Sequence, residues 1–213
     1  ASSLPIQLVG DPIVGPVPKS CDTSTGLQNT DSTLGANGIL GIGVFLQDCG
    51  SRCDQEVPLP GNYYTCSTGS CVVTRLATPY QIQHPVARFS SDNNGTVIVL
   101  PSIGNQGAAS VTGSLVFGIG TQANNALDNA TVLPVDPESG MFTSTIAGTS
   151  YPNSIIDSGS SALYLPAGLL PVCSDDLFLC PQHMSYLVAT NSTGSAQRQT
   201  SEPPDQVTFA IGN

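Results

Sequence analysis

Apolar residues in this chain form short runs that are separated by glycine, proline and small polar residues. Such runs, rich in valine, isoleucine and threonine, are typical of β-strands bounded by turns. None of them continues at helical spacing for long enough to predict a long helix. The chain is therefore expected to be all-β, with strands at 4–10, 39–43, 86–89, 96–100, 113–120, 132–135, 142–146 and 207–212.

The connections between these runs differ in character. Asp92-Asn93-Asn94-Gly95 has the residues of a hairpin turn, so the runs at 86–89 and 96–100 are expected to pair. Residues 44–80 hold four cysteines and two adjacent tyrosines, and they predict a disulfide-stapled insertion. Tyr63 and Tyr64 are expected to serve packing, and lining of a substrate cleft is the alternative. The polar stretch 190–206 is expected to be exposed.

The composition supports this class and limits the partners. The chain has 213 residues, 22 of them glycine and 17 proline, and only 9% of its residues are charged. Its net charge of −10 argues against nucleic acid and against anionic membrane surfaces as partners. No run of about 18 apolar residues is present, so the sequence predicts no membrane-spanning helix.

Six of the seven cysteines fall into close pairs. In an acidic, turn-rich chain with one lysine, such pairs favour short disulfide loops formed in an oxidising compartment, hence a secreted or periplasmic protein. A four-thiolate zinc site built from the first two pairs has permitted ligand spacings and is the alternative. The expected pairs are Cys49 with Cys53, Cys66 with Cys71, and Cys173 with Cys180. Cys21 is left without a partner in this set.

Candidate chemistry is concentrated in residues 154–166. Ile155 and Ile156 lead into Asp157-Ser158-Gly159-Ser160-Ser161, and a second apolar run follows up to Pro166. This pattern predicts a buried strand, a sharp turn that carries a carboxylate, and a return strand. Gly159 permits the turn, and the serine hydroxyls can donate to the carboxylate. Partial desolvation of that carboxylate is expected to perturb its pKa. An Asp-Ser-Gly turn without chemistry is the alternative.

This stretch resembles the active-site turn of the pepsin-like aspartic proteases, in which two apolar residues precede Asp-Thr/Ser-Gly-Thr/Ser. Its form is most similar to the second of that family's two aspartate motifs. Residues 36–43 resemble the family's A-D-G-I-L-G-L-G element, with Asn37 where the family usually has aspartate. Residues 113–120 resemble its G-x-L-x-F-G-G strand, and 207–212 resemble its closing strand. The resemblance implies a pepsin-like bilobal β-barrel fold, with 1–80 in the second half of a first lobe and 81–213 in most of a second lobe.

The resemblance also implies an activity, hydrolysis of peptide bonds in a polypeptide substrate by an activated water, without a metal or cofactor. Asp157 would be one half of the catalytic pair, Ser158 would tie two such turns together, and Ser160 would hydrogen-bond the carboxylate. Gly159 and Ser161 would support the turn.

The pepsin-like mechanism needs two carboxylates that share a proton, yet this chain has one Asp-Ser/Thr-Gly. Asp22-Thr23-Ser24 and Asp31-Ser32-Thr33 lack the glycine. The chain is therefore expected to be an incomplete piece of a longer protein and inactive as it stands. The first aspartate motif would lie upstream of Ala1, and Cys21 could bind that upstream half.

Other functions remain as alternatives. The first is a non-catalytic, secreted pepsin-fold module for binding or structure, and the second is an unrelated disulfide-stapled β-sandwich for adhesion. A homodimer in which two Asp157 turns meet is less favoured, since the chain carries parts of two lobes. His84 and His183 do not lie beside a nucleophile motif. The insertions at 44–80 and 170–206 are more typical of a poorly characterised bacterial branch than of the familiar eukaryotic enzymes.

Overall fold

The structure is a computed structural model that describes residues 6–15, 17–19, 26–67, 70–104, 107–160, 162–174, 178–193 and 205–212. The chain divides into two compact units. Unit 1 comprises residues 1–98 and 114–126, and unit 2 comprises residues 99–113 and 127–213. The regular elements are mainly strands with a few short helices, which confirms the all-β class. Assignment of the units to pepsin-like lobes stays a prediction.

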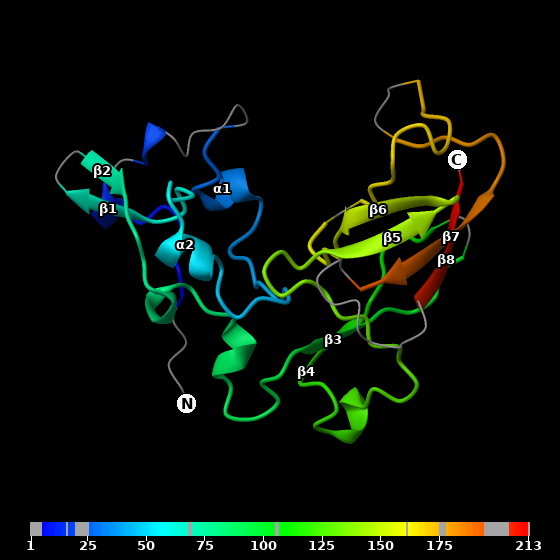
Figure 1. Cartoon of the computed structure of the whole chain (residues 1–213), viewed down its shortest axis with the longest axis horizontal. Coiled ribbons are helices and arrows are strands. Elements are labelled where there is room, and N and C mark those ends of the chain that lie inside the picture. Colours follow the sequence, from blue (N-terminus) through cyan, green and yellow to red (C-terminus); the bar gives the residue numbers. More distant parts are fainter. Residues whose placement is uncertain are drawn as a thin grey trace. The chain divides into compact units, whose positions relative to one another are not determined.

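Unit 1 holds the short helices and two strand pairs (Figure 1). Strand β1 pairs antiparallel with β2, and β3 pairs with β4. Two buried side chains, Val86 (1% exposed) and Cys53 (2% exposed), form its apolar core. The elements are η1 (Pro12–Val14), α1 (Asp31–Leu34), α2 (Ser51–Gln55), β1 (Tyr64–Ser67), β2 (Ser70–Val73), η3 (Thr78–Tyr80), η4 (Pro85–Arg88), β3 (Thr96–Val99), β4 (Ser114–Phe117) and η5 (Ala123–Asn125).

The end of β4 is fixed by a buried amide. Asn125 Oδ1 accepts hydrogen bonds from the backbone N–H groups of Thr121 and Gln122, at 2.9 and 2.7 Å. Its Nδ2 donates to the carbonyl of Phe117 over 3.0 Å. Burying an amide side chain costs little folding free energy only when its donors and acceptors are hydrogen-bonded. Asn125 meets that condition by closing the turn after β4.

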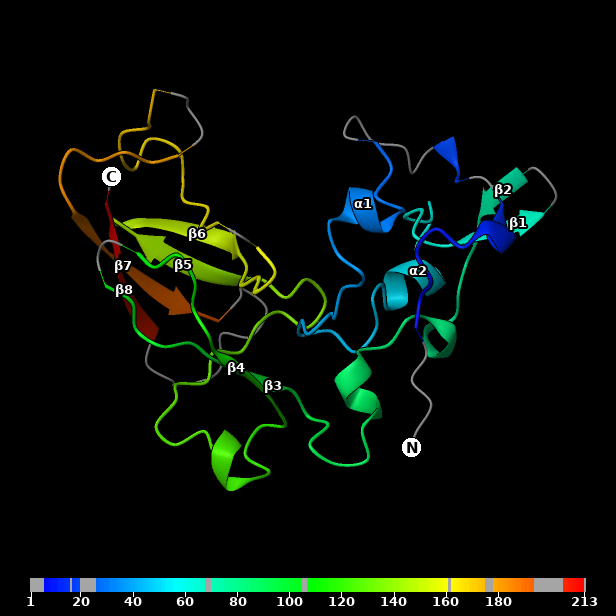
Figure 2. The ribbon, with the colours of Figure 1, turned by 180° about the vertical axis from the view of Figure 1, so that it is seen from behind.

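Unit 2 contains a four-stranded antiparallel sheet in the order β6-β5-β7-β8, built from β5 (Phe142–Ile146), β6 (Thr149–Ser154), β7 (Ser185–Ser192) and β8 (Asp205–Ile211) (Figures 1 and 2). Ala147 (φ 50°) and Gly148 (φ 80°) form the two-residue turn between β5 and β6, where positive φ at both positions matches the twist of a hairpin. Every second residue of β5 is buried, as the period of a strand requires.

Several predicted strands are absent. Residues 6–10, 39–43 and 132–135 are irregular. The run at 86–89 lies largely in η4, because Pro85 favours a helical first turn and the Nδ1 of His84 accepts from the N–H of Val86 over 3.2 Å. The turn at 92–95 therefore does not join a hairpin, and β3 pairs with β4 instead. The predicted strand at 142–146 is confirmed with its ends, and those at 96–100, 113–120 and 207–212 are confirmed with shifted ends.

The three predicted disulfides are present, namely Cys49–Cys53, Cys66–Cys71 and Cys173–Cys180. The zinc alternative for the first four cysteines is therefore wrong, because their sulfurs are bonded to one another. Cys66 and Cys71 are also facing partners in the β1–β2 hairpin, so the 44–80 insertion is partly regular. Cys21 lies outside the described residues. Within the described part of the chain, no helix is long and apolar enough to cross a membrane.

Candidate functional site

Asp157 lies just beyond the end of strand β6, in an exposed turn. The expected buried strand before it is wrong: Ile155 and Ile156 are 61% and 80% exposed. The expected return strand is also absent, and Leu163 is 64% exposed. The register explains this. Ser154 faces Phe142, the first residue of β5, so the chain beyond Ser154 has run past the strand that would pair with it.

The turn itself forms as predicted from its residue types. The backbone N–H of Gly159 donates to Asp157 Oδ1 over 2.9 Å, and the hydroxyl of Ser160 donates to Oδ2 over 2.7 Å. The N–H of Ser160 donates to the carbonyl of Asp157 over 3.3 Å. Ser158 is exposed, and no bond of its side chain is found within the described residues. Ser161 lies outside the described residues.

These bonds set the charge state of the carboxylate. The hydroxyl of Ser160, and after it the N–H of Gly159, lower the pKa of Asp157 below its ordinary value of 3.8. Both donors bind the ionised form, and the carboxylate is exposed, so desolvation does not reverse their effect. A pKa shift caused mainly by desolvation was the wrong expectation. Asp157 is a stable anion at neutral and mildly acidic pH.

A cavity of about 630 Å³ lies beside this carboxylate in unit 2. Its lining is mainly apolar, and Asp157 is the one carboxylate among the described residues that line it. Phe142, Ser144 and Ile146 come from β5, Ala189 and Asn191 from β7, and Val207 and Phe209 from β8; residues 153–157 and 162–166 line it as well, together with Tyr151 and Ser160. The arrangement presents an anion and a serine hydroxyl at an apolar cavity, which could receive an apolar side chain next to a polar reacting group.

A second turn in unit 2 has almost the same geometry. Asp136 accepts from the hydroxyl of Ser139 over 2.8 Å and from the N–H groups of Ser139 and Glu138, at 2.8 and 3.1 Å. Bonds from Ser139 lower the pKa of Asp136 as well. Asp136 does not line the cavity. The hydrogen-bonded turn is therefore not distinctive alone, and the cavity is what sets Asp157 apart.

Neither histidine joins this site. His84 serves as the cap of η4, and His183 is exposed, with its carbonyl accepting from the hydroxyl of Ser185 over 3.3 Å. Among the described residues, no group of three or more His, Cys, Asp or Glu side chains could hold a metal ion.

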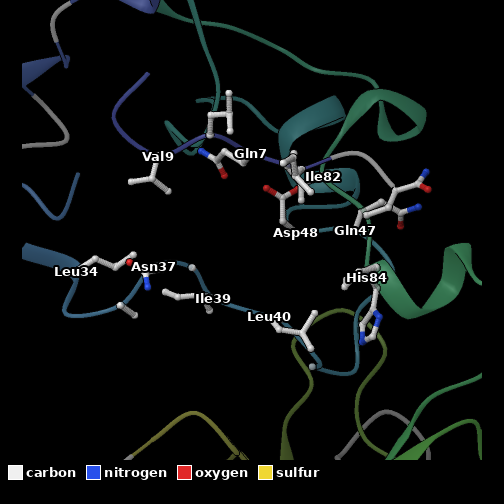
Figure 3. Close-up of a pocket in the computed structure, with 18 of the residues that line it drawn as sticks. Gln7, Val9, Leu34, Asn37, Ile39, Leu40, Gln47, Asp48, Ile82 and His84 are labelled. Carbon is white, nitrogen blue, oxygen red and sulfur yellow. The ribbon is translucent and has the colours of Figure 1, made fainter. Parts of the chain in front are cut away.

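A larger cavity lies in unit 1, and the sequence did not predict it. This unit 1 groove has a volume of about 850 Å³ and lies between residues 6–9 and 36–43, with residues 82–85 at one end (Figure 3). Asp48 lines it, and the hydroxyl of Tyr63 donates to both carboxylate oxygens of Asp48, over 2.6 and 2.7 Å. Tyr63 also accepts from the N–H of Ile82 over 3.0 Å. Burial, and after it the bond to Asp48, raises the pKa of Tyr63 to about 12.

Comparison with known proteins identifies the family. A family model described as a protein of unknown function, DUF3443, matches residues 1–213, the whole chain. The chain belongs to DUF3443. No curated protein and no solved structure matches this DUF3443 chain. Membership of DUF3443 gives neither an activity nor a substrate.

Proposed function

We propose that the chain is part of a secreted or periplasmic, pepsin-like aspartic endopeptidase in which Asp157 supplies one of the two catalytic carboxylates. The observation that carries this proposal is the position of Asp157, hydrogen-bonded by Gly159 and Ser160 at the edge of an apolar cavity. Three disulfides support an oxidising compartment.

The charge state of Asp157 fits one of the two roles. In the aspartic protease pair, one carboxylate is ionised and takes a proton from the attacking water, while the other is protonated and donates to the substrate carbonyl. The lowered pKa of Asp157 favours the ionised role. Ser160 would be a positioning residue that holds Oδ2, leaving the remaining lone pairs of the carboxylate for water.

The second carboxylate would come from a segment outside these residues. Asp157 is the one carboxylate among the described residues lining its cavity, and a single ionised aspartate cannot both accept and donate the two protons. We therefore expect this 213-residue chain to show no proteolysis by itself. Ser158 would contact the partner turn, as in the family that the motif resembles.

The alternative is a non-catalytic binding or structural module of the same fold. This alternative is favoured by the single carboxylate among the described residues that line the cavity, since catalysis needs two. It is also favoured by the similarity of the Asp157 turn to the Asp136 turn. In this case the cavity beside Asp157 would bind a ligand without catalysing a reaction.

The test uses the complete gene product and a denatured polypeptide substrate between mildly and strongly acidic pH. The proposal expects cleavage by the complete protein, loss of cleavage in Asp157→Asn, and full activity in Asp136→Asn. The second variant is a matched control, since it removes the same charge from the same kind of turn. Unchanged cleavage in Asp157→Asn, or an inactive complete protein, would reject the endopeptidase and leave the binding module.

A further inference from the structure

One wall of the unit 1 groove exposes backbone at several glycine positions. Residues 36–43 line it with three glycines, Gly38, Gly41 and Gly43, at which an added Cβ would meet no atom within 4 Å. None of the three has a positive φ. Within the part of the chain that the structure describes, residues 36–45 make no hydrogen bond.

The groove already contains the start of a strand pairing. Among its lining residues, Gln47 forms an antiparallel bridge with Gln83. The N–H of His84 donates to the carbonyl of Leu46 over 2.8 Å, and the N–H of Asp48 donates to the carbonyl of Ile82 over 3.1 Å. The pairing stops at this single bridge, because residues 85–88 turn into η4. Within the described part of the chain, the backbone groups of residues 36–45 are unpaired, so they present a free edge beside the groove.

The side chains around this edge are apolar and exposed. Ile39 is 78% exposed, Leu8 is 65% exposed and Leu40 is 53% exposed. Figure 3 shows Leu34, Asn37, Ile39 and Leu40 along one side of the groove and Val9, Gln7, Ile82 and Asp48 along the other. A row of open backbone groups between two apolar walls is the arrangement that binds an extended peptide as an added strand.

The charges of the groove select the kind of peptide. Asp31 and Asp48 line it, and no lysine or arginine is among the described residues that do so. Tyr63 is the one donor found for Asp48 in the described part of the chain, so lone pairs of that carboxylate stay open to a further donor. A small apolar ligand would use neither these carboxylates nor the free backbone.

We propose that the unit 1 groove binds an extended polypeptide segment by strand addition along residues 36–43, and that it prefers segments in which apolar residues alternate and arginine or lysine flanks them. Alternate side chains of the segment enter the groove between Ile39 and Leu8, and a basic side chain reaches Asp48. This binding function is separate from the chemistry proposed at Asp157, since no residue of that cavity lies in unit 1.

The experiment measures the fluorescence anisotropy of a labelled peptide of about eight residues, in which valine alternates with threonine between two terminal arginines. One control peptide carries N-methylated valines, which lack the backbone donor, and another carries glutamates in place of the arginines. The proposal expects both changes to weaken binding about tenfold or more.

Variants of the chain distinguish peptide binding in the groove from nonspecific binding to other exposed apolar residues. Ile39→Asn removes an apolar side chain from the groove wall without changing its charge and is expected to weaken binding of the arginine peptide about tenfold or more. Val72→Asn is the matched control: Val72 is also exposed (61%), lies in unit 1 on β2 and does not line the groove, so binding should not change. Circular dichroism of both variants verifies that they fold.

Three outcomes would overturn the proposal. Equal binding of the N-methylated peptide would exclude strand addition, and an equal loss of peptide binding in Val72→Asn would exclude the groove as the binding site. Concentration-dependent dimerisation that Ile39→Asn abolishes, without any peptide binding, would show that a second copy of the chain occupies the edge.

Discussion

Ser144 and Asn191 face each other across strands β5 and β7, and the hydroxyl of Ser144 donates to Asn191 Oδ1 over 2.7 Å. Both side chains are buried, at 9% and 7% exposed, and both line the cavity beside Asp157. The apolar face of the sheet therefore carries one polar pair at its centre. The hydroxyl of Ser144 and the Oδ1 of Asn191 are hydrogen-bonded to each other, so removing either side chain leaves the other without this partner.

Breaking this pair is expected to destabilise unit 2. Ser144→Ala and Asn191→Ala each leave a buried polar group without that partner, which costs about 1–3 kcal/mol of unfolding free energy. Urea denaturation measures the loss. Ser150→Ala is the control: Ser150 is exposed and its hydroxyl bonds the half-buried Thr145, so its loss should cost below about 0.5 kcal/mol. Equal losses in all three variants would contradict the assigned burial.

The titration of Asp157 should depend on Ser160. Ser160→Ala removes the donor to Oδ2, so the pKa of Asp157 should rise toward its ordinary value of 3.8. Carboxyl carbon chemical shifts followed by NMR during an acid titration measure the midpoint. Because the folded-state pKa is lowered, the stabilising contribution is present above the ordinary value and is lost as pH falls through the folded value. Ser139→Ala should move the pKa of Asp136 and leave Asp157 unchanged, so a shift of Asp157 in that variant would argue against a local cause.

Tyr63 should ionise late in an alkaline titration. Its pKa of about 12 stands above the ordinary 10.0, mainly because of burial and next because of the bond to Asp48. The raised value means that its stabilising contribution is complete below pH 10 and is lost as the pH rises toward 12. Absorbance of phenolate monitors the step. Asp48→Asn should lower the pKa while burial keeps it above 10.0, and Tyr63→Phe should remove the step. If the high-pH ionisation step persists in Tyr63→Phe, it belongs to another tyrosine and the prediction for Tyr63 is wrong.

The disulfides should differ in what their removal costs. The loops span 4 residues for Cys49–Cys53 and 5 for Cys66–Cys71, so chain entropy gives each bond about 2 kcal/mol. Cys53 is 2% exposed, and its carbonyl accepts from the N–H of Leu76 over 3.1 Å. Replacing Cys49 and Cys53 by alanine should therefore cost more than replacing Cys66 and Cys71, as thermal unfolding would measure. A larger loss of stability on replacing Cys66 and Cys71 would contradict this prediction, because it would show that the disulfide in the β1–β2 hairpin contributes more.

The sequence predicted those elements whose signal is local. Strand β5 contains phenylalanine, isoleucine and two threonines, which favour strands, and the strand at 207–212 has apolar residues at positions 207, 209 and 211. The closely spaced cysteines can form only short loops. The turn at Asp157 also follows from neighbours, because Gly159 and Ser160 lie within three residues of it.

The errors arose where a distant partner decides the structure. Ile155 and Ile156 have the residue types of a strand, but β5 begins opposite Ser154, so no residue of β5 is available to pair with them. Residues 39–43 lack a partner strand for the same reason. The contact of Asp48 with Tyr63 joins residues 15 apart. A D-x-G sequence at Asp48-Cys49-Gly50, after the apolar residues 44–46, was the one local signal that could have drawn attention to it.

The strand order β6-β5-β7-β8 also has a kinetic consequence for the candidate site. The β5–β6 hairpin joins neighbours in the chain, whereas the β5–β7 pair closes a loop of 47 residues between Ser144 and Asn191, and Asp157 lies inside that loop. Closing a long loop costs more entropy than closing a hairpin, so β5–β6 should gain protection from amide exchange before β7 does during refolding. Because residues of β7 and β8 line the cavity beside Asp157, that cavity should be completed only after the β5–β6 hairpin has formed.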